Sequence, residues 1–180
     1  MVMLGCKPPG RLTEQHDTFF AIADAASQLE PQIRAFWPEP KKIHADAVRW
    51  VHHVAGYAVE VVAKAEALNG GLKLWFINLG GYKQNEFDEF HYKLLTVAAN
   101  KSAAIEAAKQ TAFYKHTGFA GAPSHVDDKY GVDVDDVYEL EDVLAPPLKQ
   151  QYSLRITPAA NLPPDRVELG YITMEKLQEL

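Results

Sequence analysis

The chain repeats itself, and this feature constrains its fold more than any other. When the sequence is compared with itself, Leu4-Gly5 matches Leu79-Gly80. The same offset pairs Glu14 with Glu89, His16 with His91, Ala23 with Ala98 and Ser27 with Ser102, and we call it the first offset. A self-match at a fixed offset indicates one structural unit that occurs twice. We therefore expect residues 2–62 and 77–143 to follow the same backbone path.

The offset becomes larger in the later part of each copy. His44 matches His125, and this second offset also pairs Asp46 with Asp127, Val51 with Val132, Tyr57 with Tyr138, Glu60 with Glu141 and Val62 with Val143. An insertion in the second copy would absorb the change. We place it near residues 116–121, because glycine-containing loops tolerate insertions.

Each copy is predicted to contain a strand, a second strand, a helix and a third strand. In the second copy, residues 72–79 are apolar and β-rich, and Gly80-Gly81 is expected to end this strand. Residues 92–98 form the next strand, and Asn100 or Ser102 caps the helix that follows. In the first copy, the apolar residues Leu29, Ile33, Phe36 and Trp37 recur with helical spacing.

The predicted fold class is α+β. We expect a tandem duplication of a β-β-α-β unit, with a mainly antiparallel sheet, helices on one face and pseudo-two-fold symmetry. Residues 1–71 would form the first repeat and residues 72–156 the second, packed as one continuous domain. Because the strand at 72–79 closes one copy and opens the next, one continuous sheet is expected. Residues 157–180 would form a linker and a short helix.

Charge and composition exclude several partners. The net charge is −6, and all of it lies in residues 77–180, which carry ten Lys+Arg and sixteen Asp+Glu. Nucleic acid is therefore not an expected partner, because such binding requires basic side chains. No apolar run reaches the ~20 residues of a membrane span. The single cysteine, Cys6, suits a reducing compartment, and we expect a cytoplasmic protein. The expected binding partner of the whole chain is another protein or a second copy of the same chain.

Several short motifs resemble those of a small bacterial family. They are the starts Leu4-Gly5-Cys6-Lys7 and Asn78-Leu79-Gly80-Gly81-Tyr82, the segment Glu14-Gln15-His16-Asp17, and Ser124-His125-Val126-Asp127-Asp128-Lys129-Tyr130-Gly131. The family is catalogued as a domain of unknown function, number fifteen forty-three. The resemblance extends to about residue 156 and implies one or two copies of the domain. It implies no activity, substrate or catalytic residue.

The polar residues that match between the copies are the candidate functional residues. They are Glu14, His16, His44 and Asp46 in the first copy, and Glu89, His91, His125 and Asp127 in the second. Residues two apart on a strand share a face, so each motif presents a carboxylate beside an imidazole. If the two motifs of a copy are neighbours, four ligands converge, which suits a divalent metal such as zinc, iron or manganese. The competing interpretation is purely structural, with these groups satisfying one another or the loop backbone.

Three functional hypotheses follow. The leading one is a non-catalytic cytosolic module that binds a small molecule or another protein, because no complete catalytic motif occurs. The first alternative is a metal-dependent, hydrolase-like enzyme built on the matched residues. The second is an acidic regulator that docks on a basic partner. Residues 127–142 are acidic but fail the calcium-loop pattern, so a solvated face is expected there. Cys6 aligns with Gly81, which favours a small buried residue over a nucleophile.

Overall fold

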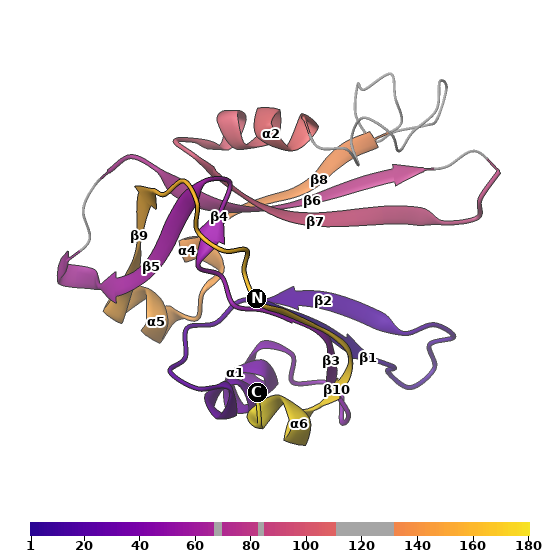
Figure 1. Cartoon of the computed structure of the whole chain (residues 1–180). Coiled ribbons are helices and arrows are strands. Elements are labelled where there is room, and N and C mark those ends of the chain that lie inside the picture. The colour runs from indigo at the N-terminus through magenta and orange to yellow at the C-terminus, as the bar shows by residue number, and fades with distance from the viewer. Residues whose placement is uncertain (67–69, 83–84, 111–131) are drawn as a thin grey trace.

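The structure is a computed structural model that describes residues 1–66, 70–82, 85–110 and 132–180 (Figure 1). The first sheet has the order β10-β3-β1-β2 and contains β1 (Val2–Cys6), β2 (Gln15–Phe19), β3 (His44–Arg49) and β10 (Val167–Thr173). The second sheet has the order β4-β5-β9 and contains β4 (His53–Val54), β5 (Tyr57–Ala63) and β9 (Tyr152–Pro158). The third sheet has the order β7-β6-β8 and contains β6 (Lys73–Tyr82), β7 (Glu89–Ala98) and β8 (Val132–Glu139).

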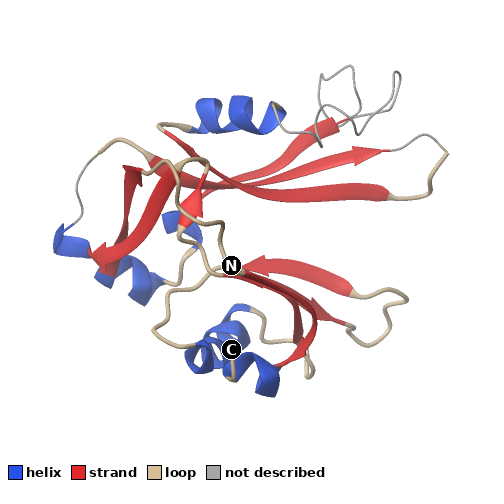
Figure 2. Cartoon of the chain, in the orientation of Figure 1, coloured by secondary structure: helices blue, strands red, loops and turns tan. Residues whose placement is uncertain are grey.

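Short helices connect and cover these sheets. They are α1 (Leu29–Phe36), α2 (Lys101–Lys109), α4 (Leu140–Val143), α5 (Pro146–Gln151) and α6 (Met174–Gln178), with single 3-10 turns η1 (Ala26–Gln28) and η2 (Lys64–Glu66). The strand pairs of the described residues are antiparallel, as the α+β prediction requires. Helices α1 and α6 lie on the outer side of the first sheet, and α2 lies on the outer side of the third (Figures 1 and 2). The faces of these two sheets that lie opposite α1, α6 and α2 are therefore turned toward each other.

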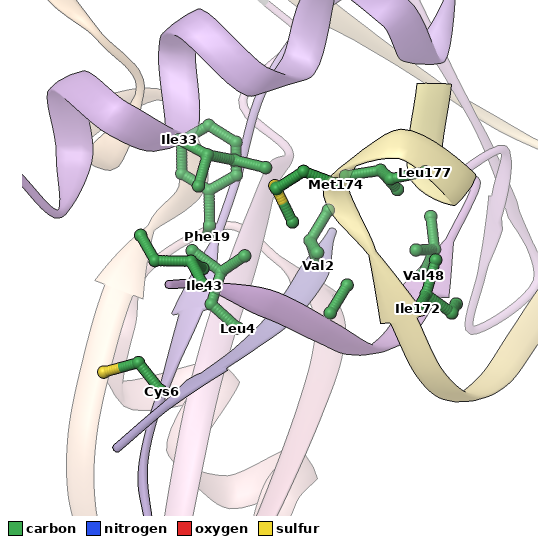
Figure 3. Packing of buried hydrophobic residues seen from close by; sticks show 11 residues of the cluster. Val2, Leu4, Cys6, Phe19, Ile33, Ile43, Val48, Ile172, Met174 and Leu177 are labelled. Atoms are coloured by element: carbon green, nitrogen blue, oxygen red, sulfur yellow. The ribbon is translucent and has the colours of Figure 1, made fainter. Parts of the chain in front are cut away.

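Alternation along β1 builds the core beneath the first sheet. Val2, Leu4 and Cys6 are buried on the side that faces α1 and α6. Ile33 from α1 and Leu177 from α6 are fully buried against them, and Figure 3 shows these side chains converging. Because successive side chains on a strand point to opposite faces, Gly5 must lie on the other, helix-free face.

The third sheet is built in the same way. Ile77 and Leu79 on β6 pack against Ala104 and Ala108, whose small side chains let α2 approach the sheet closely. The opposite face of β6 carries Leu74 and Phe76, which join a separate core with residues from the second sheet. Beyond Phe76, the same face of β6 carries Asn78 and Gly80, which leave room for polar side chains from the neighbouring strands.

The two hairpins share one pairing register. In β1–β2, Val2 lies opposite Phe19 and Gly5 lies opposite His16. In β6–β7, Ile77 lies opposite Leu94 and Gly80 lies opposite His91. The positions in the second hairpin are those that the first offset of the sequence comparison assigns to the first hairpin.

The second offset, in contrast, is wrong as a structural correspondence. Tyr57 lies on β5, which pairs with β4 and β9, whereas Tyr138 lies on β8, which pairs with β6. The strand that corresponds to β8 is β3, because Gly5 on β1 lies opposite His44 and Gly80 on β6 lies opposite Asp133. Backbone pairing with the central strand, rather than scattered side-chain identities, sets the correspondence. His125 and Asp127 lie outside the described residues.

The expected continuous sheet is also wrong, since the described strands form three sheets. Strand β9 pairs with β5, and β10 pairs with β3, so late segments complete sheets begun by residues 1–71. The helix expected within 157–180 is α6, which is capped by the Thr173 side chain that accepts from Lys176 N. The same segment also contains β10, which the sequence does not predict, because Gly170, with a φ of 123°, interrupts its alternation.

Candidate metal centre

Four of the candidate residues lie together on the helix-free face of the first sheet. Glu14 immediately precedes β2, which carries His16, and β3 carries His44 and Asp46. Gly5 on the intervening strand lies opposite both histidines. Residues opposite each other on neighbouring antiparallel strands share a face, so the three strands direct these side chains to the same place. We call Glu14, His16, His44 and Asp46 the first cluster.

The first cluster forms a closed ring of alternating carboxylates and imidazoles. His16 Nε2 lies 3.2 Å from Asp46 Oδ2 and 3.6 Å from Glu14 Oε2. His44 Nε2 lies 3.2 Å from Glu14 Oε1 and 3.3 Å from Asp46 Oδ1. Each carboxylate therefore presents one oxygen to each histidine. The sequence expectation that the two motifs of the first copy become neighbours agrees with this geometry.

His44 is the buried member of the ring. Its side chain is 7% exposed, whereas those of His16 and Glu14 are 42% and 41% exposed. Although carboxylate oxygens are within 3.3 Å, His44 Nε2 is buried and makes no hydrogen bond of acceptable geometry, and the same is true of Asp46 Oδ2. Burying a polar atom without a hydrogen bond costs roughly 1–3 kcal/mol. A buried imidazole nitrogen flanked by carboxylates, with no hydrogen bond of its own, has the surroundings of a metal ligand.

Gly5 makes this arrangement sterically feasible. A β-carbon at Gly5 would lie 2.5 Å from His44 Nε2 and 2.6 Å from Asp46 Oδ2. A bulge between Met3 and Leu4 in the β1–β3 pairing leaves Asp46 as the extra residue beside them. Bulges commonly re-aim a side chain in this way. The imidazole and the carboxylate therefore occupy the space over β1 that any larger residue would fill.

A second cluster lies at the corresponding place on the third sheet. The donor atoms of Glu89, His91 and Asp135 all lie within 4.8 Å of one another. His91 Nε2 is 3.3 Å from Asp135 Oδ2, and both side chains are partly exposed. Asp135 also lies over Gly80 so closely that a β-carbon there would collide with its carboxylate. We call Glu89, His91 and Asp135 the second cluster.

Sequence reasoning finds most of these residues but misses others. It assigns Asp135 to a solvated acidic face, although Asp133-x-Asp135 repeats the spacing of His44-x-Asp46. It ends a strand at Gly80-Gly81, whereas β6 continues to Tyr82. Gly80 serves close packing beneath a carboxylate rather than a turn. A glycine at matched positions of two apolar strands is the signal that could have identified this role.

Cys6 is not part of the centre. The residue is 1% exposed and belongs to the core beneath the first sheet. Burial raises the pKa of its thiol, and the negative charge of Glu14 raises it further. The thiol therefore stays protonated and unreactive at neutral pH, which agrees with a structural role.

Part of the acidic stretch is committed to internal contacts. Glu139 forms an ion pair with Lys73 at 2.6 Å, and Glu141 forms one with Lys64 at 3.0 Å. Burial alone would raise the pKa of Glu141, but hydrogen bonds from Leu154 N and Ser153 Oγ, together with Lys64, outweigh it and lower the pKa. These two carboxylates are therefore already paired with lysines of the same chain.

Comparisons with known proteins agree with the fold. A family described as Domain of Unknown Function (DUF1543) matches residues 11–61, a segment that contains the whole first cluster. Among solved structures, the crystal structure of a protein Il1583 from Idiomarina loihiensis has a TM-score of 0.62. That match covers 96% of this chain and 94% of the other at 21% sequence identity, which shows a shared fold. No protein with a curated description matches the chain. Within the described residues, no helix has the length and apolar character of a membrane span.

Proposed function

We propose that this chain, whose residues 11–61 match a family of unknown function, binds a divalent transition-metal ion at the first cluster. The observation that carries the proposal is the buried His44 Nε2, which has no hydrogen bond and lies beside two carboxylates. Two imidazole nitrogens and two carboxylate oxygens are ligands that suit zinc, iron and manganese. The two carboxylates would also neutralise the charge of a divalent ion.

The neighbouring distances around the first cluster have the length that this assignment needs, but the ring must contract to hold an ion, because no three of its donor atoms, one from each residue, lie within 4.8 Å of one another as those of the second cluster do. Metal bonds of ~2.0–2.1 Å to nitrogen or oxygen place neighbouring ligands of a tetrahedral ion about 3.3 Å apart. The four nitrogen-to-oxygen distances of the ring are 3.2, 3.2, 3.3 and 3.6 Å. To share one ion, each carboxylate would turn a single oxygen toward the centre. That turn is a rotation about a terminal side-chain bond, whose torsion is broad and soft.

The structural alternative explains the ring less well. A neutral imidazole carries one proton, and a proton on Nε2 cannot point at both carboxylates at once. A ring held by charge alone therefore requires two protonated histidines. Imidazolium and carboxylate charges coexist only in mildly acidic solution, whereas metal binding requires deprotonated imidazoles and strengthens as the pH rises. The pH dependence of the cluster's stability thus separates the two interpretations.

We further propose that the molecule arose by tandem duplication, with pseudo-two-fold symmetry between the β1–β2–β3 and β6–β7–β8 units. The equal register of the two hairpins supports this, as does the glycine beneath an aspartate in each unit. The second cluster would then be a weaker cation site, because it offers three ligand residues, with one imidazole, whereas the first cluster offers four, with two imidazoles.

Cation binding, rather than catalysis, is the activity that the first cluster supports best. Structural metal sites are closed by four protein ligands, whereas hydrolytic sites keep a position open for water. The first cluster supplies four ligands. We propose a non-catalytic binding protein on this basis. Hydrolysis of model phosphate or ester substrates by the metal-loaded chain would instead favour the enzymatic alternative.

Metal analysis and calorimetry test the proposal. The purified chain, stripped with a chelator and titrated with Zn²⁺ and Mn²⁺, should bind at least one ion. Replacing His44→Ala should weaken binding at this site by roughly 100-fold or more, because loss of the ligand itself costs at least as much as loss of a group that orients it. The matched control is His52→Ala, which removes an exposed imidazole from the same half of the chain. Failure of the wild-type chain to bind either ion, with its fold intact by circular dichroism, would refute the proposal.

A further inference from the structure

The ring of His44 is stacked on an aromatic residue from the far end of the sequence. The ring centroids of His44 and Tyr171 are 4.2 Å apart, and their planes are inclined by 30°. Tyr171 belongs to β10, which lies beside β3 in the first sheet. It also lies well outside residues 11–61, the segment that carries all four residues of the first cluster.

A bulge in β10 brings Tyr171 to this position. Leu169 lies opposite Ala47 and Ile172 lies opposite Ala45, so Gly170 and Tyr171 together face the single residue Asp46. The φ of Gly170 is 123°, a conformation that residues with a side chain rarely adopt. The glycine therefore permits the irregularity that directs the next side chain over the metal-site face. Bulges are conspicuous where a strand must re-aim a side chain.

Tyr171 and Gly5 restrict the imidazole from two neighbouring strands. The backbone at Gly5 on β1 lies close to Nε2 of His44, and the Tyr171 ring from β10 covers the imidazole. Tyr171 nevertheless remains 69% exposed, so burial of its own surface does not account for its placement. Its stacking contact is with the one cluster member that is itself buried, His44.

We propose that Tyr171 is a positioning residue of the metal site, and this inference rests on the proposed function. Its ring holds the His44 imidazole so that Nε2 faces Glu14 and Asp46, and it shields that ligand from solvent. The site is therefore completed by a strand that the family match does not include. The ring, rather than the hydroxyl group, performs this task, because the stacking face is the part in contact.

Three variants test the proposal. Tyr171→Phe keeps the ring, Tyr171→Ala removes it, and Leu169→Ala removes another exposed side chain, 78% exposed, from the same strand. Removing a residue that orients a ligand typically lowers metal affinity 10- to 100-fold. We expect that loss for Tyr171→Ala, and affinities within threefold of wild type for Tyr171→Phe and Leu169→Ala, measured by calorimetry with Zn²⁺.

A second readout follows the stack without metal. In the chelator-treated protein, the Tyr171 ring should shift the ring-proton resonances of His44 in nuclear magnetic resonance spectra. Tyr171→Phe should preserve this shift, and Tyr171→Ala should abolish it while the fold is retained. Wild-type affinity in Tyr171→Ala, or an unchanged His44 resonance, would overturn the positioning role and leave the metal site standing. A wild-type chain that binds no metal would overturn both proposals.

Discussion

A methyl group on Gly5 would lie 2.5 Å from Nε2 of His44, well inside van der Waals contact. The backbone of β1 therefore packs directly against the His44 side chain, which belongs to the neighbouring strand β3. The same relationship recurs between Gly80 and Asp135 in the third sheet. A missing side chain on the central strand is thus as much a part of each cluster as the polar groups above it.

Gly5→Ala is expected to damage the first cluster directly. The new methyl group would push His44 and Asp46 apart, which we expect to weaken Zn²⁺ binding at least about tenfold, as displacing an oriented ligand does. Overpacking should also lower the free energy of unfolding by about 1–3 kcal/mol. Calorimetry and urea unfolding measure the two effects. Gly70→Ala is the control, because nothing lies within 4 Å of a β-carbon there. Equal affinities for both variants would contradict the role of Gly5.

The second cluster predicts the stoichiometry of binding. The wild-type chain should take up two ions, a tight one at the first cluster and a weaker one at the second. His91→Ala should abolish the weaker event, because it removes the only imidazole of the second cluster, and should leave the tight one unchanged. Titration calorimetry with Mn²⁺ separates the two events. A single event that disappears in His91→Ala would show that the second cluster is the principal site.

Asp165 should make stability depend on pH in the acid range. Burial tends to raise the pKa of its carboxyl, but hydrogen bonds from His52 N, Arg49 and His53 N outweigh burial and lower the pKa below its usual 3.8. The resulting stabilisation is present above pH 3.8 and is lost as the pH falls through the lower, folded-state value.

Asp165→Asn should therefore lower the free energy of unfolding by about 1–3 kcal/mol at neutral pH, since His52 N, His53 N and the Arg49 side chain lose a charged acceptor. The deficit should shrink below pH 4. Urea unfolding at several pH values measures it. Asp88→Asn, at an exposed position in the β6–β7 loop, should show no comparable deficit. A deficit that stays constant down to pH 3 would mean that the charge of Asp165 is not what stabilises the fold.

Asn100 and Ser102 are the two candidates for the N-cap of α2, and their variants should differ in stability. The Asn100 side chain accepts a hydrogen bond from Ala103 N at 3.0 Å, so it is the N-cap. Asn100→Ala should cost about 1 kcal/mol of stability. Ser102→Ala lies inside the helix, at an exposed position, and should be neutral or slightly stabilising. Thermal unfolding compares the two variants, and the reverse order would be inconsistent with this cap.

Local patterns predict the separate elements well. The helical spacing of Leu29, Ile33 and Phe36 corresponds to α1, and Asn100 is one of the two expected caps of α2. The first offset also predicts that the two hairpins have the same pairing register, because hairpin register depends on residues close in sequence. The residues of the first cluster are predicted by the matched motifs, but their convergence depends on the pairing of β3 with β1, which is not a contact between residues close in sequence.

The long-range assembly could not be predicted in this way. The second offset rests on identities such as Tyr57 with Tyr138, but β5 and β8 belong to different sheets. Pairing between strands that are distant in sequence depends on how the rest of the chain packs. The residues of each strand alone therefore do not show which strand it will pair with. The bulge at Gly170 could not be predicted either, because Asp46, the residue that it faces, lies in the other half of the sequence.

Strands near the C-terminus pair with strands from the N-terminal part of the chain, and this arrangement affects how the chain folds. Ala45 pairs with Ile172 and Val59 pairs with Ile156, and contacts of such high sequence separation slow folding. On the ribosome, β3 emerges long before β10, and its open edge must wait while most of the chain is synthesised. One edge of the strand that carries His44 and Asp46 is thus among the last to be paired, and Tyr171 reaches the His44 ring only when translation is nearly over.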